Sequence, residues 1–201
     1  MPAQPPDSTA AIRPDLSRFD NRSYHPGRNR LWQAAWFFLG LPLLRCTMLP
    51  SSAVRRGLLR LFGARIGKGV VIKPGVRVKY PWRLDIGDFT WIGEDCWIDN
   101  LDQVTIGDNA CLSQGVYLCT GNHDWKDPAF ALRTAPIRIG AGAWVAARAS
   151  LAPGVSVGEC AIAGFGAVVT REIPPFEIHA GNPAKPVANR ATAGFASSRP
   201  V

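Results

Sequence analysis

The stretch IGAGAWVAARASLAPGVSVGECAIAGFGAVV, at residues 139–169, decides the fold, because an aliphatic residue or alanine returns at every sixth position. A small or β-branched residue stands four positions after each of the first five. An amphipathic helix repeats near 3.6 residues and a simple strand at two, so neither alone gives a period of six. Short strands separated by tight turns do give it, and the pattern predicts the stacked coils of a parallel β-helix.

The same repeat continues toward the N-terminus as far as Ile66. Its phase slips by two residues from Val78 to Ile86 and again from Ile98 to Ile106, which predicts bulged corners. A β-sandwich would place its turns at irregular intervals, and eleven in-phase pairs of repeat positions disfavour it. Glycine often fills the second position of the repeat, and we relate it to unusual backbone angles in the turns. These glycines are Gly67, Gly87, Gly93, Gly107, Gly140, Gly158 and Gly164.

The composition fits one packed domain with a basic N-terminal extension. Of 201 residues 47% are apolar and 19% charged, which disfavours a disordered chain or a coiled coil. The net charge of +8 is uneven, because residues 1–65 contain ten arginines, no lysine and three aspartates. Five cysteines without a CxxC pair disfavour a disulfide framework and favour a reduced, cytoplasmic setting. We expect neither a secretory signal nor a stretch long enough to span a membrane.

We divide the chain into four regions. Residues 1–28, which are polar and lack periodicity, are predicted to be a mobile N-terminal tail. Residues 29–63 carry apolar positions at helical spacing and are predicted to be an amphipathic helical segment. The β-helix domain is expected at residues 64–187, and residues 188–201 are expected to form a C-terminal tail.

The helical segment allows two roles. In the first role it lies in a membrane interface, with Trp32 and Trp36 at headgroup depth. Arg55, Arg56 and Arg60 would then contact anionic lipid at the inner face of the membrane. In the second role the helices close the open end of the first coil. Nucleic-acid binding is disfavoured because the segment lacks a recognition motif and is nearly half apolar.

The repeat [Ile/Leu/Val]-Gly-x-x-[small]-x resembles that of the hexapeptide-repeat acyltransferases over residues 64 to about 187. Three segments narrow the resemblance to O-acetyltransferases: IGKGVVIKPGVRVKYPW, WIGEDCWIDNLDQVTIGDNACLSQGVYLCTGNHDW and VVTREIPPFEIHAGNPAKPV. They are similar to the colanic acid biosynthesis acetyltransferase group and to the maltose and galactoside O-acetyltransferases.

The resemblance implies an all-β fold, a left-handed parallel β-helix of hexapeptide repeats with an N-terminal helical segment. It also implies a homotrimer with sites between subunits and acetyl-CoA as the acetyl donor. The implied reaction is acetyl transfer to a saccharide hydroxyl in exopolysaccharide biosynthesis. It leaves open which sugar is acetylated, and whether the acceptor is free, nucleotide-linked or lipid-linked.

Acyl transfer to a hydroxyl needs a general base, and a neutral imidazole suits this task near neutral pH. Of the three histidines, only His123 lies in the large insertion at residues 121–136. The resemblance implies the same residue, because the family's catalytic histidine follows the Thr-Gly of the corresponding loop; here Asn122 intervenes. Cys119 is an alternative nucleophile, but a cysteine at a strand position is more often a small buried hydrophobe.

The first bulged corner and the large insertion supply candidate contacts to the acceptor. Carboxylates bind sugar hydroxyls through charge-assisted hydrogen bonds, and tryptophan faces stack on sugar rings. For any single tryptophan, packing between subunits or against the helices is the alternative. The candidates are Asp99, Asn100, Asn122, Asp124 and Trp125, with Asp102, Trp82, Trp91 and Trp97 as further positions.

The resemblance also implies residues that contact CoA in the groove between coils. Close relatives carry a further basic residue three positions after Lys185, where this chain has Ala188, and Arg190 is a possible substitute. Arg171 and Lys185 have the alternative of being solvated surface charges. The matched positions are Ala147, Gly164, Phe165, Thr170, Arg171 and Lys185.

Two further functions are weighed. The gamma-class carbonic anhydrases share a related fold, but catalytic zinc needs three protein ligands, typically histidines, and only one histidine lies within the coils. We therefore expect no metal. Outside the enzymes, the alternative is a non-catalytic β-helix that scaffolds or binds a partner, and such a protein would not need His123.

Overall fold

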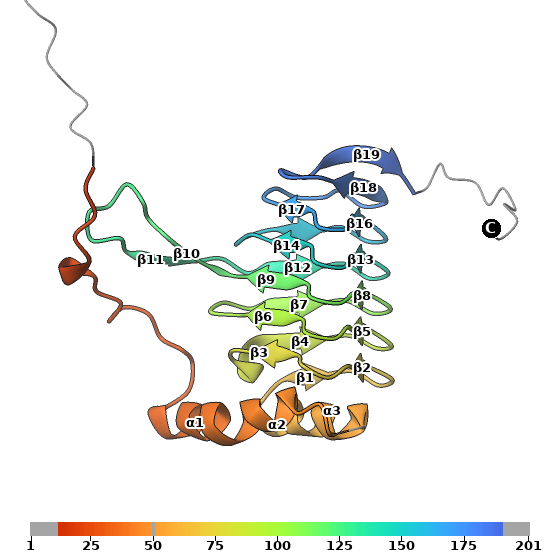
Figure 1. The fold of residues 1–201 in the computed structure, drawn as a ribbon, viewed down its shortest axis with the longest axis horizontal. Helices are drawn as coiled ribbons and strands as arrows, with labels where there is room; N and C mark the ends of the chain where they lie inside the picture. Colours follow the sequence, from red (N-terminus) through yellow and green to blue (C-terminus); the bar gives the residue numbers. More distant parts are fainter. Residues whose placement is uncertain (1–11, 50, 191–201) are drawn as a thin grey trace, which may run out of the picture.

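The computed structural model describes residues 12–49 and 51–190. From β1 to β17 short strands follow one another around three sheets, and each strand except the hairpin pair β10 and β11 pairs in parallel with its neighbours one coil away (Figure 1). This confirms the predicted parallel β-helix of hexapeptide repeats. Sheet A contains β1 (Arg65–Ile66), β4 (Leu84–Ile86), β7 (Val104–Ile106), β12 (Ile137–Ile139) and β15 (Ser156–Val157). Sheet B contains β2 (Val71–Ile72), β5 (Trp91–Ile92), β8 (Cys111–Leu112), β13 (Trp144–Val145), β16 (Ile162–Ala163), β18 (Glu177–Ala180) and β19 (Lys185–Asn189). Sheet C contains β3 (Arg77–Val78), β6 (Trp97–Asp99), β9 (Tyr117–Cys119), β14 (Ser150–Leu151) and β17 (Val168–Val169).

The residues that begin the repeats fill the interior of the coils. Their register places Ile66 beside Ile86, Ile86 beside Ile106, and Ile106 beside Ile139. All four side chains are buried, and burial of an aliphatic side chain stabilises a fold by about 1.5–3 kcal/mol. The six-residue period holds because a shift would turn this apolar column outward.

The glycines at the second position of the repeat have a different role from the one predicted. The left-handed backbone occurs two residues later than predicted, at Gly69 with φ of 65° and at Asp95 with φ of 57°. The second-position glycines have a different reason. A Cβ added at Gly107 would lie 2.6 Å from the backbone nitrogen of Ala141 in the next coil. Glycine stands there because stacked coils approach too closely for a side chain.

The outward faces of sheets A and B differ in chemistry. Sheet A presents charged and hydroxyl side chains, and sheet B presents apolar ones. Contact with water is therefore less favourable for the outward face of sheet B than for that of sheet A. The outward column of sheet A is Arg65, Asp85, Thr105, Arg138 and Ser156, and that of sheet B is Val71, Trp91, Cys111, Trp144, Ile162 and Ile178.

Helices close the end of the coils below β1 and β2 in Figure 1, as the second predicted role requires. Trp36 is fully buried, and its Nε1–H donates to the carbonyl of Val78 at 3.1 Å. This burial contradicts a place for Trp36 at headgroup depth. Within residues 12–49 and 51–190, no helix has the length and apolarity needed to cross a membrane. The helices are η1 (Leu16–Arg18), α1 (Arg30–Ala35), the π-helix η2 (Trp36–Gly40), α2 (Leu41–Arg45), α3 (Ser52–Leu61) and η3 (Pro81–Arg83).

The arginines of α3 contact the protein, and the burial of Arg55 contradicts its predicted contact with lipid; Arg56 is half-buried and Arg60 exposed, so for these two the lipid contact stays a prediction. Arg55 is 1% exposed, and its guanidinium donates to two carbonyls of the segment between α2 and α3. Arg56 donates to the carbonyl of Val70 at 2.5 Å, and Arg60 donates to that of Ile66 at 2.8 Å. Carbonyls of the first coil lack a preceding coil to pair with, and the guanidinium groups of Arg56 and Arg60 donate to them instead.

Residues 12–28, predicted as part of a mobile tail, run along the coils and form defined contacts (Figure 1). We call them the N-terminal strap. The Asp15 N–H donates to the carbonyl of Pro128 at 2.8 Å. The Tyr24 hydroxyl donates to the carbonyl of Leu101 at 2.7 Å. These hydrogen bonds join the strap to the coils; the rest of the predicted tail lies outside the described residues.

The opposite end of the coils is closed by the antiparallel pair β18 and β19. Strand β19 continues to Asn189, two residues past the predicted end of the domain. The Arg190 guanidinium donates to the carbonyls of Gly142 and Cys160, both at 3.2 Å, so it is committed to the coils and is a poor substitute for a CoA-binding cation. The remainder of the predicted C-terminal tail lies outside the described residues.

Candidate active site

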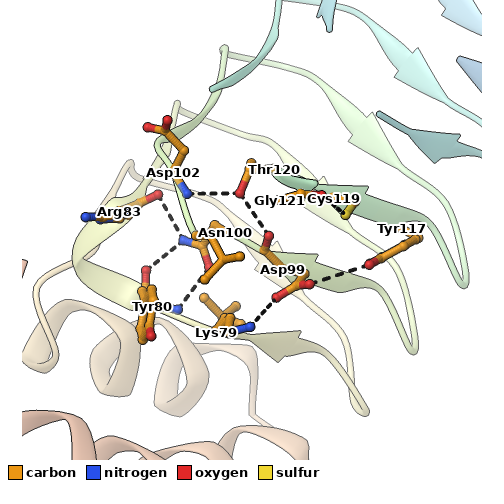
Figure 2. A network of polar contacts seen from close by, with 12 residues as sticks. Lys79, Tyr80, Arg83, Asp99, Asn100, Asp102, Tyr117, Cys119, Thr120 and Gly121 are labelled. Atoms are coloured by element: carbon orange, nitrogen blue, oxygen red, sulfur yellow. Dashed lines mark hydrogen bonds and ion pairs between the residues drawn. The ribbon is translucent and has the colours of Figure 1, made fainter. Parts of the chain in front are cut away.

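The predicted bulges and the large insertion stack on one corner of the coils, where the chain passes from sheet C to sheet A. We call this the irregular corner: residues 79–83, 99–103 and 119–136, contributed by three successive coils. Figure 2 shows the polar contacts that join them. The corner gathers most of the predicted acceptor contacts and the predicted base.

Asn100 and Asp102 hold the irregular corner together. Asn100 is fully buried; its Oδ1 accepts from the Tyr80 N–H at 2.9 Å, and its Nδ2 donates to the carbonyls of Tyr80 and Arg83 at 2.7 and 2.9 Å. The Asp102 N–H donates to Thr120 Oγ1 at 2.9 Å. Because both amide hydrogens of Asn100 are used by the backbone, this residue supports the corner and does not contact an acceptor as predicted.

Asp99 faces outward on sheet C with a half-buried carboxylate. Its Oδ1 lies 3.1 Å from Nζ of Lys79, and the Tyr117 hydroxyl donates to its Oδ2 at 3.5 Å (Figure 2). Burial raises the pKa of Tyr117, so the phenol stays protonated and can donate. A cavity of about 220 Å³, lined in part by Asp99 and Trp97, opens beside this group. The Asp99 side chain is 15% exposed, so its carboxylate borders the cavity through a small part of its surface and keeps spare acceptor capacity.

The large insertion forms an antiparallel hairpin that projects from the coils (Figure 1). Its strands are β10 (Gly121–His123) and β11 (Leu132–Thr134), and His123 pairs with Leu132. The hairpin carries His123 away from the coil surface on a paired strand. The loop therefore places the histidine on a defined backbone.

The imidazole of His123 is oriented by Phe130. Its Nδ1 lies 2.8 Å from the Phe130 carbonyl oxygen, and the two rings stack with centroids 4.4 Å apart and planes 9° apart. Since a carbonyl only accepts, Nδ1 must carry the hydrogen, and a neutral ring then has its lone pair on Nε2. Phe19 of the strap lies against the same ring, with centroids 5.7 Å apart. This arrangement suits Nε2 for removing a proton.

The neighbours of His123 divide between loop support and open surface. Asn122 Oδ1 accepts from the His123 N–H at 2.8 Å. The Asp124 carboxylate pairs with the guanidinium of Arg133 across the hairpin. The Trp125 side chain is 70% exposed. Of these three predicted acceptor contacts, Trp125 has an open ring face, and the other two are engaged within the loop.

The other tryptophans lie in different places. Trp82 stacks on Tyr80 in the irregular corner, with centroids 5.0 Å apart, which agrees with its packing alternative. Trp97 packs against Tyr117 on sheet C at 4.7 Å. Trp91 is 57% exposed on sheet B, in the apolar column. Only Trp97 borders the cavity beside the Asp99 carboxylate.

Three positions matched to CoA contacts lie on the corner between sheets B and C. Ala147 follows β13 and Gly164 follows β16, so they occupy adjacent coils. The Gly166 N–H donates to the carbonyl of Ala147 at 2.9 Å. A Cβ added at Gly164 would stand 3.1 Å from another side chain, and Phe165 is 72% exposed. The glycine permits close stacking, and the phenyl ring is free for a ligand.

The remaining three matched positions lie elsewhere. Thr170 and Arg171 follow β17, on the corner between sheets C and A, and both are exposed. Lys185 begins β19 and is also exposed. The structure does not gather all six positions at one point. A ligand that touched both sets would extend across the outward face of sheet C.

Neither Cys119 nor a metal fits the site. The Cys119 thiol is 3.1 Å from the carbonyl of Gly121 and donates to it (Figure 2), so its hydrogen is engaged within its own turn. Among the described residues, no three side chains of His, Cys, Asp or Glu come together as a metal site would need.

Four residues of the site were missed by sequence reasoning. Phe130 orients His123, Phe19 and Tyr24 bring the strap to the corner, and Lys79 pairs with Asp99. Lys79 could have been found, because it lies one twenty-residue coil before the carboxylate. The strap residues carry no periodic signal.

No family model matches the chain. The chain is 37% identical over 176 residues, 88% of its length and 97% of the relative's, to a protein of Escherichia coli K12 named as a colanic acid biosynthesis acetyltransferase, WcaF. It is 29% identical over 140 residues to the galactoside O-acetyltransferase of the same organism, covering 68% and 69% of the two chains. The solved structure of the hexapeptide-repeat acetyltransferase VCA0836 from Vibrio cholerae with acetyl-CoA superposes with a TM-score of 0.72 at 21% identity, over 79% and 87% of the chains. Repeat, fold and identity with the first relative over nearly its whole length agree: this chain belongs to the hexapeptide-repeat acetyltransferases.

Proposed function

We propose that this chain transfers the acetyl group of acetyl-CoA to a hydroxyl group of a saccharide, with His123 as the general base. The observation that carries the proposal is the hydrogen bond from His123 Nδ1 to the Phe130 carbonyl, which leaves the Nε2 lone pair free. The names of the relatives support the saccharide: one refers to galactoside and the other to colanic acid biosynthesis. We place the acceptor in exopolysaccharide biosynthesis on the second name.

The reaction needs no covalent enzyme intermediate. Nε2 of His123 takes the hydroxyl proton as the acceptor oxygen attacks the thioester carbonyl carbon. The tetrahedral intermediate collapses, the carbon–sulfur bond breaks, and the CoA thiolate takes the proton from the imidazolium. Phe130 holds the ring in the productive tautomer throughout, which is a positioning role.

Acetyl transfer by His123 variants tests the proposal. His123→Asn keeps a side-chain N–H that can reach the Phe130 carbonyl but removes the base. We expect kcat to fall on the order of 10²–10⁴-fold in both His123→Asn and His123→Ala. Acetyl-CoA affinity, measured by isothermal titration, should stay within about twofold in both. A non-catalytic scaffold would bind no acetyl-CoA, and its properties would not change in the His123 variants. Absence of acetyl-CoA binding, or an unchanged kcat in both variants, would exclude the proposal.

For the donor, we propose that CoA lies along the outward face of sheet C. Phe165 and Ala147 would contact one end, and Arg171 and Lys185 would provide positive charge for the phosphates. The exposure of Phe165, Arg171 and Lys185, with Ala147 half-buried, supports the assignment. Lys185→Gln should weaken acetyl-CoA binding, with a smaller loss for dephospho-CoA if the lysine meets the ribose phosphate.

We also propose that the chain assembles as a homotrimer through sheet B, with its sites between subunits. The apolar outward column of sheet B supports this arrangement, because exposed Trp91 and Trp144 would be buried by a neighbouring coil stack. The polar column of sheet A would remain in water.

We also propose a peripheral membrane contact through the helical segment, made by residues other than the tryptophans and arginines named in the sequence analysis. Leu31, Phe38 and Met48 are between 80% and 86% exposed, and Arg45 of the same helical segment is also exposed. Such a face suits an anionic bilayer surface. Cosedimentation with phosphatidylglycerol vesicles should fall for Phe38→Asp and not for Leu16→Asp, an exposed leucine on the strap. Equal loss in both variants would refute the surface.

A further inference from the structure

A cavity of about 730 Å³ lies between the N-terminal part of the chain and the irregular corner. Residues 19–33 form one wall, and Lys79, Tyr80, Leu101 and Leu132 form the other. This volume lies within the range of about 300–1,000 Å³ that small-molecule sites occupy, and it exceeds what one pyranose ring needs. The two walls are joined by the hydrogen bond from the Tyr24 hydroxyl to the carbonyl of Leu101.

His123 is not among the lining residues, but two residues that line the cavity are neighbours of this proposed base. Leu132 lines it and is the register partner of His123 in the hairpin. Directly paired residues of antiparallel strands place their side chains on the same face. Phe19 also lines the cavity and lies against the His123 ring. A molecule held in the cavity can therefore present a group to the imidazole.

The lining is cationic. Arg22, Arg28, Arg30 and Lys79 contribute to it, and no aspartate or glutamate of the described chain does. Arg22 pairs with Asp20, and Lys79 pairs with the Asp99 carboxylate. Arg28 and Arg30 form no ion pair within the described residues. Guanidinium groups without a carboxylate partner favour an anion in the space they line.

We propose that this cavity binds the acceptor saccharide through a negative charge that the saccharide carries. The inference rests on the proposed acetyl transfer and narrows its substrate class. The charge is a carboxylate, as on a uronic acid residue, or a phosphate, as on a glycosyl phosphate. Phe19 and Tyr24 line the same space and offer ring surface to the sugar.

Binding by isothermal titration to the full chain tests the inference without an acetyl donor. The probes are methyl β-glucuronide, glucose 1-phosphate and the neutral methyl β-glucoside. We expect at least one charged probe to bind about tenfold or more tighter than the neutral one, and the stronger charged probe identifies the source of the anion. Affinity for that probe should fall as salt concentration rises.

Variants test which arginines bind the negative charge of the probe. Arg28→Gln combined with Arg30→Gln should weaken the charged probe about ten- to a hundredfold and leave the neutral probe within about twofold. The control is Arg18→Gln, which removes one positive charge from the strap outside the cavity, and it should change the affinity for neither probe. Unfolding midpoints equal to that of the parent chain establish that the variants are folded.

Equal affinity for charged and neutral probes, or no binding of any probe, would overturn the inference. So would a loss of equal size in the Arg18→Gln control. If the double variant does not fold, the comparison of probes and the salt dependence on the parent chain decide the same question. Failure of acetyl transfer would appear separately, in the His123 experiments with acetyl-CoA.

Discussion

Replacement of Asn100 by aspartate separates a structural role from the acceptor contact that the sequence predicts. The new side chain has nearly the same shape and keeps an oxygen for the Tyr80 N–H, which lies 2.9 Å from Oδ1 in the parent chain. It loses both donors, which reach the carbonyls of Tyr80 and Arg83 at 2.7 and 2.9 Å. The Tyr80 carbonyl keeps the hydrogen bond from the Arg83 N–H at 3.0 Å, whereas the Arg83 carbonyl is left without a partner.

The magnitude follows from these two lost donors. The unsatisfied Arg83 carbonyl costs about 1–3 kcal/mol and the lost second hydrogen bond to the Tyr80 carbonyl about 0.5–1.5 kcal/mol. Asn100→Asp should therefore reduce the free energy of unfolding by about 2–4 kcal/mol. Burial beside carbonyl oxygens should raise the folded-state pKa of the new carboxyl above its unfolded value. Its protonated form can donate to one carbonyl, so the loss should be smaller at pH 4 than at pH 7.

Urea unfolding followed by circular dichroism measures the effect. The control is Asn122→Asp, the same change at an exposed side chain, which should cost less than about 0.5 kcal/mol. A stability of Asn100→Asp within about 1 kcal/mol of the parent, together with a raised KM for the acceptor, would refute the framework assignment. It would restore Asn100 to the acceptor site.

Three further results are expected. Gly107→Ala should destabilise the chain by about 1–3 kcal/mol in the same unfolding assay, because the new Cβ would lie 2.6 Å from the backbone of the next coil. Gly57→Ala, where nothing lies within 4 Å of the new Cβ, should stabilise α3 by up to about 1 kcal/mol. Burial raises the pKa of the Cys96 thiol from 9.0 to about 12, so the contribution of the buried thiol to stability is complete below pH 9 and is lost as pH rises toward 12. Unfolding measured at several pH values across this range checks the prediction, and a free energy of unfolding that does not change with pH would contradict the burial. Trp144→Arg should reduce the mass measured by light scattering from that of a trimer, whereas Arg138→Ala on sheet A should not; equal masses would exclude sheet B as the interface.

The coil architecture could be predicted because its cause is periodic. A residue such as Ile106 must face inward in every coil, and the spacing that achieves this is written directly in the sequence. The bulged corner at residues 99–103 could be predicted for the same reason, since it breaks the period. The roles of the glycines could not, because the approach of neighbouring coils at Gly107 depends on the stacking distance and not on the turn.

The arginines of the N-terminal region show why composition alone misplaces charge. Arg56 and Arg60 donate to carbonyls that the first coil leaves unpaired, and Arg55 donates to carbonyls of the segment between α2 and α3. Arg28 and Arg30 have no such carbonyl partners and line a cavity beside the proposed base. The basic excess of residues 1–65 therefore divides into two parts: one closes the end of a stack of coils, and the other lines the cavity in which we propose that the acceptor binds. A charge count cannot divide these, because the division depends on which arginines lie over the open end of the coils and which line the cavity.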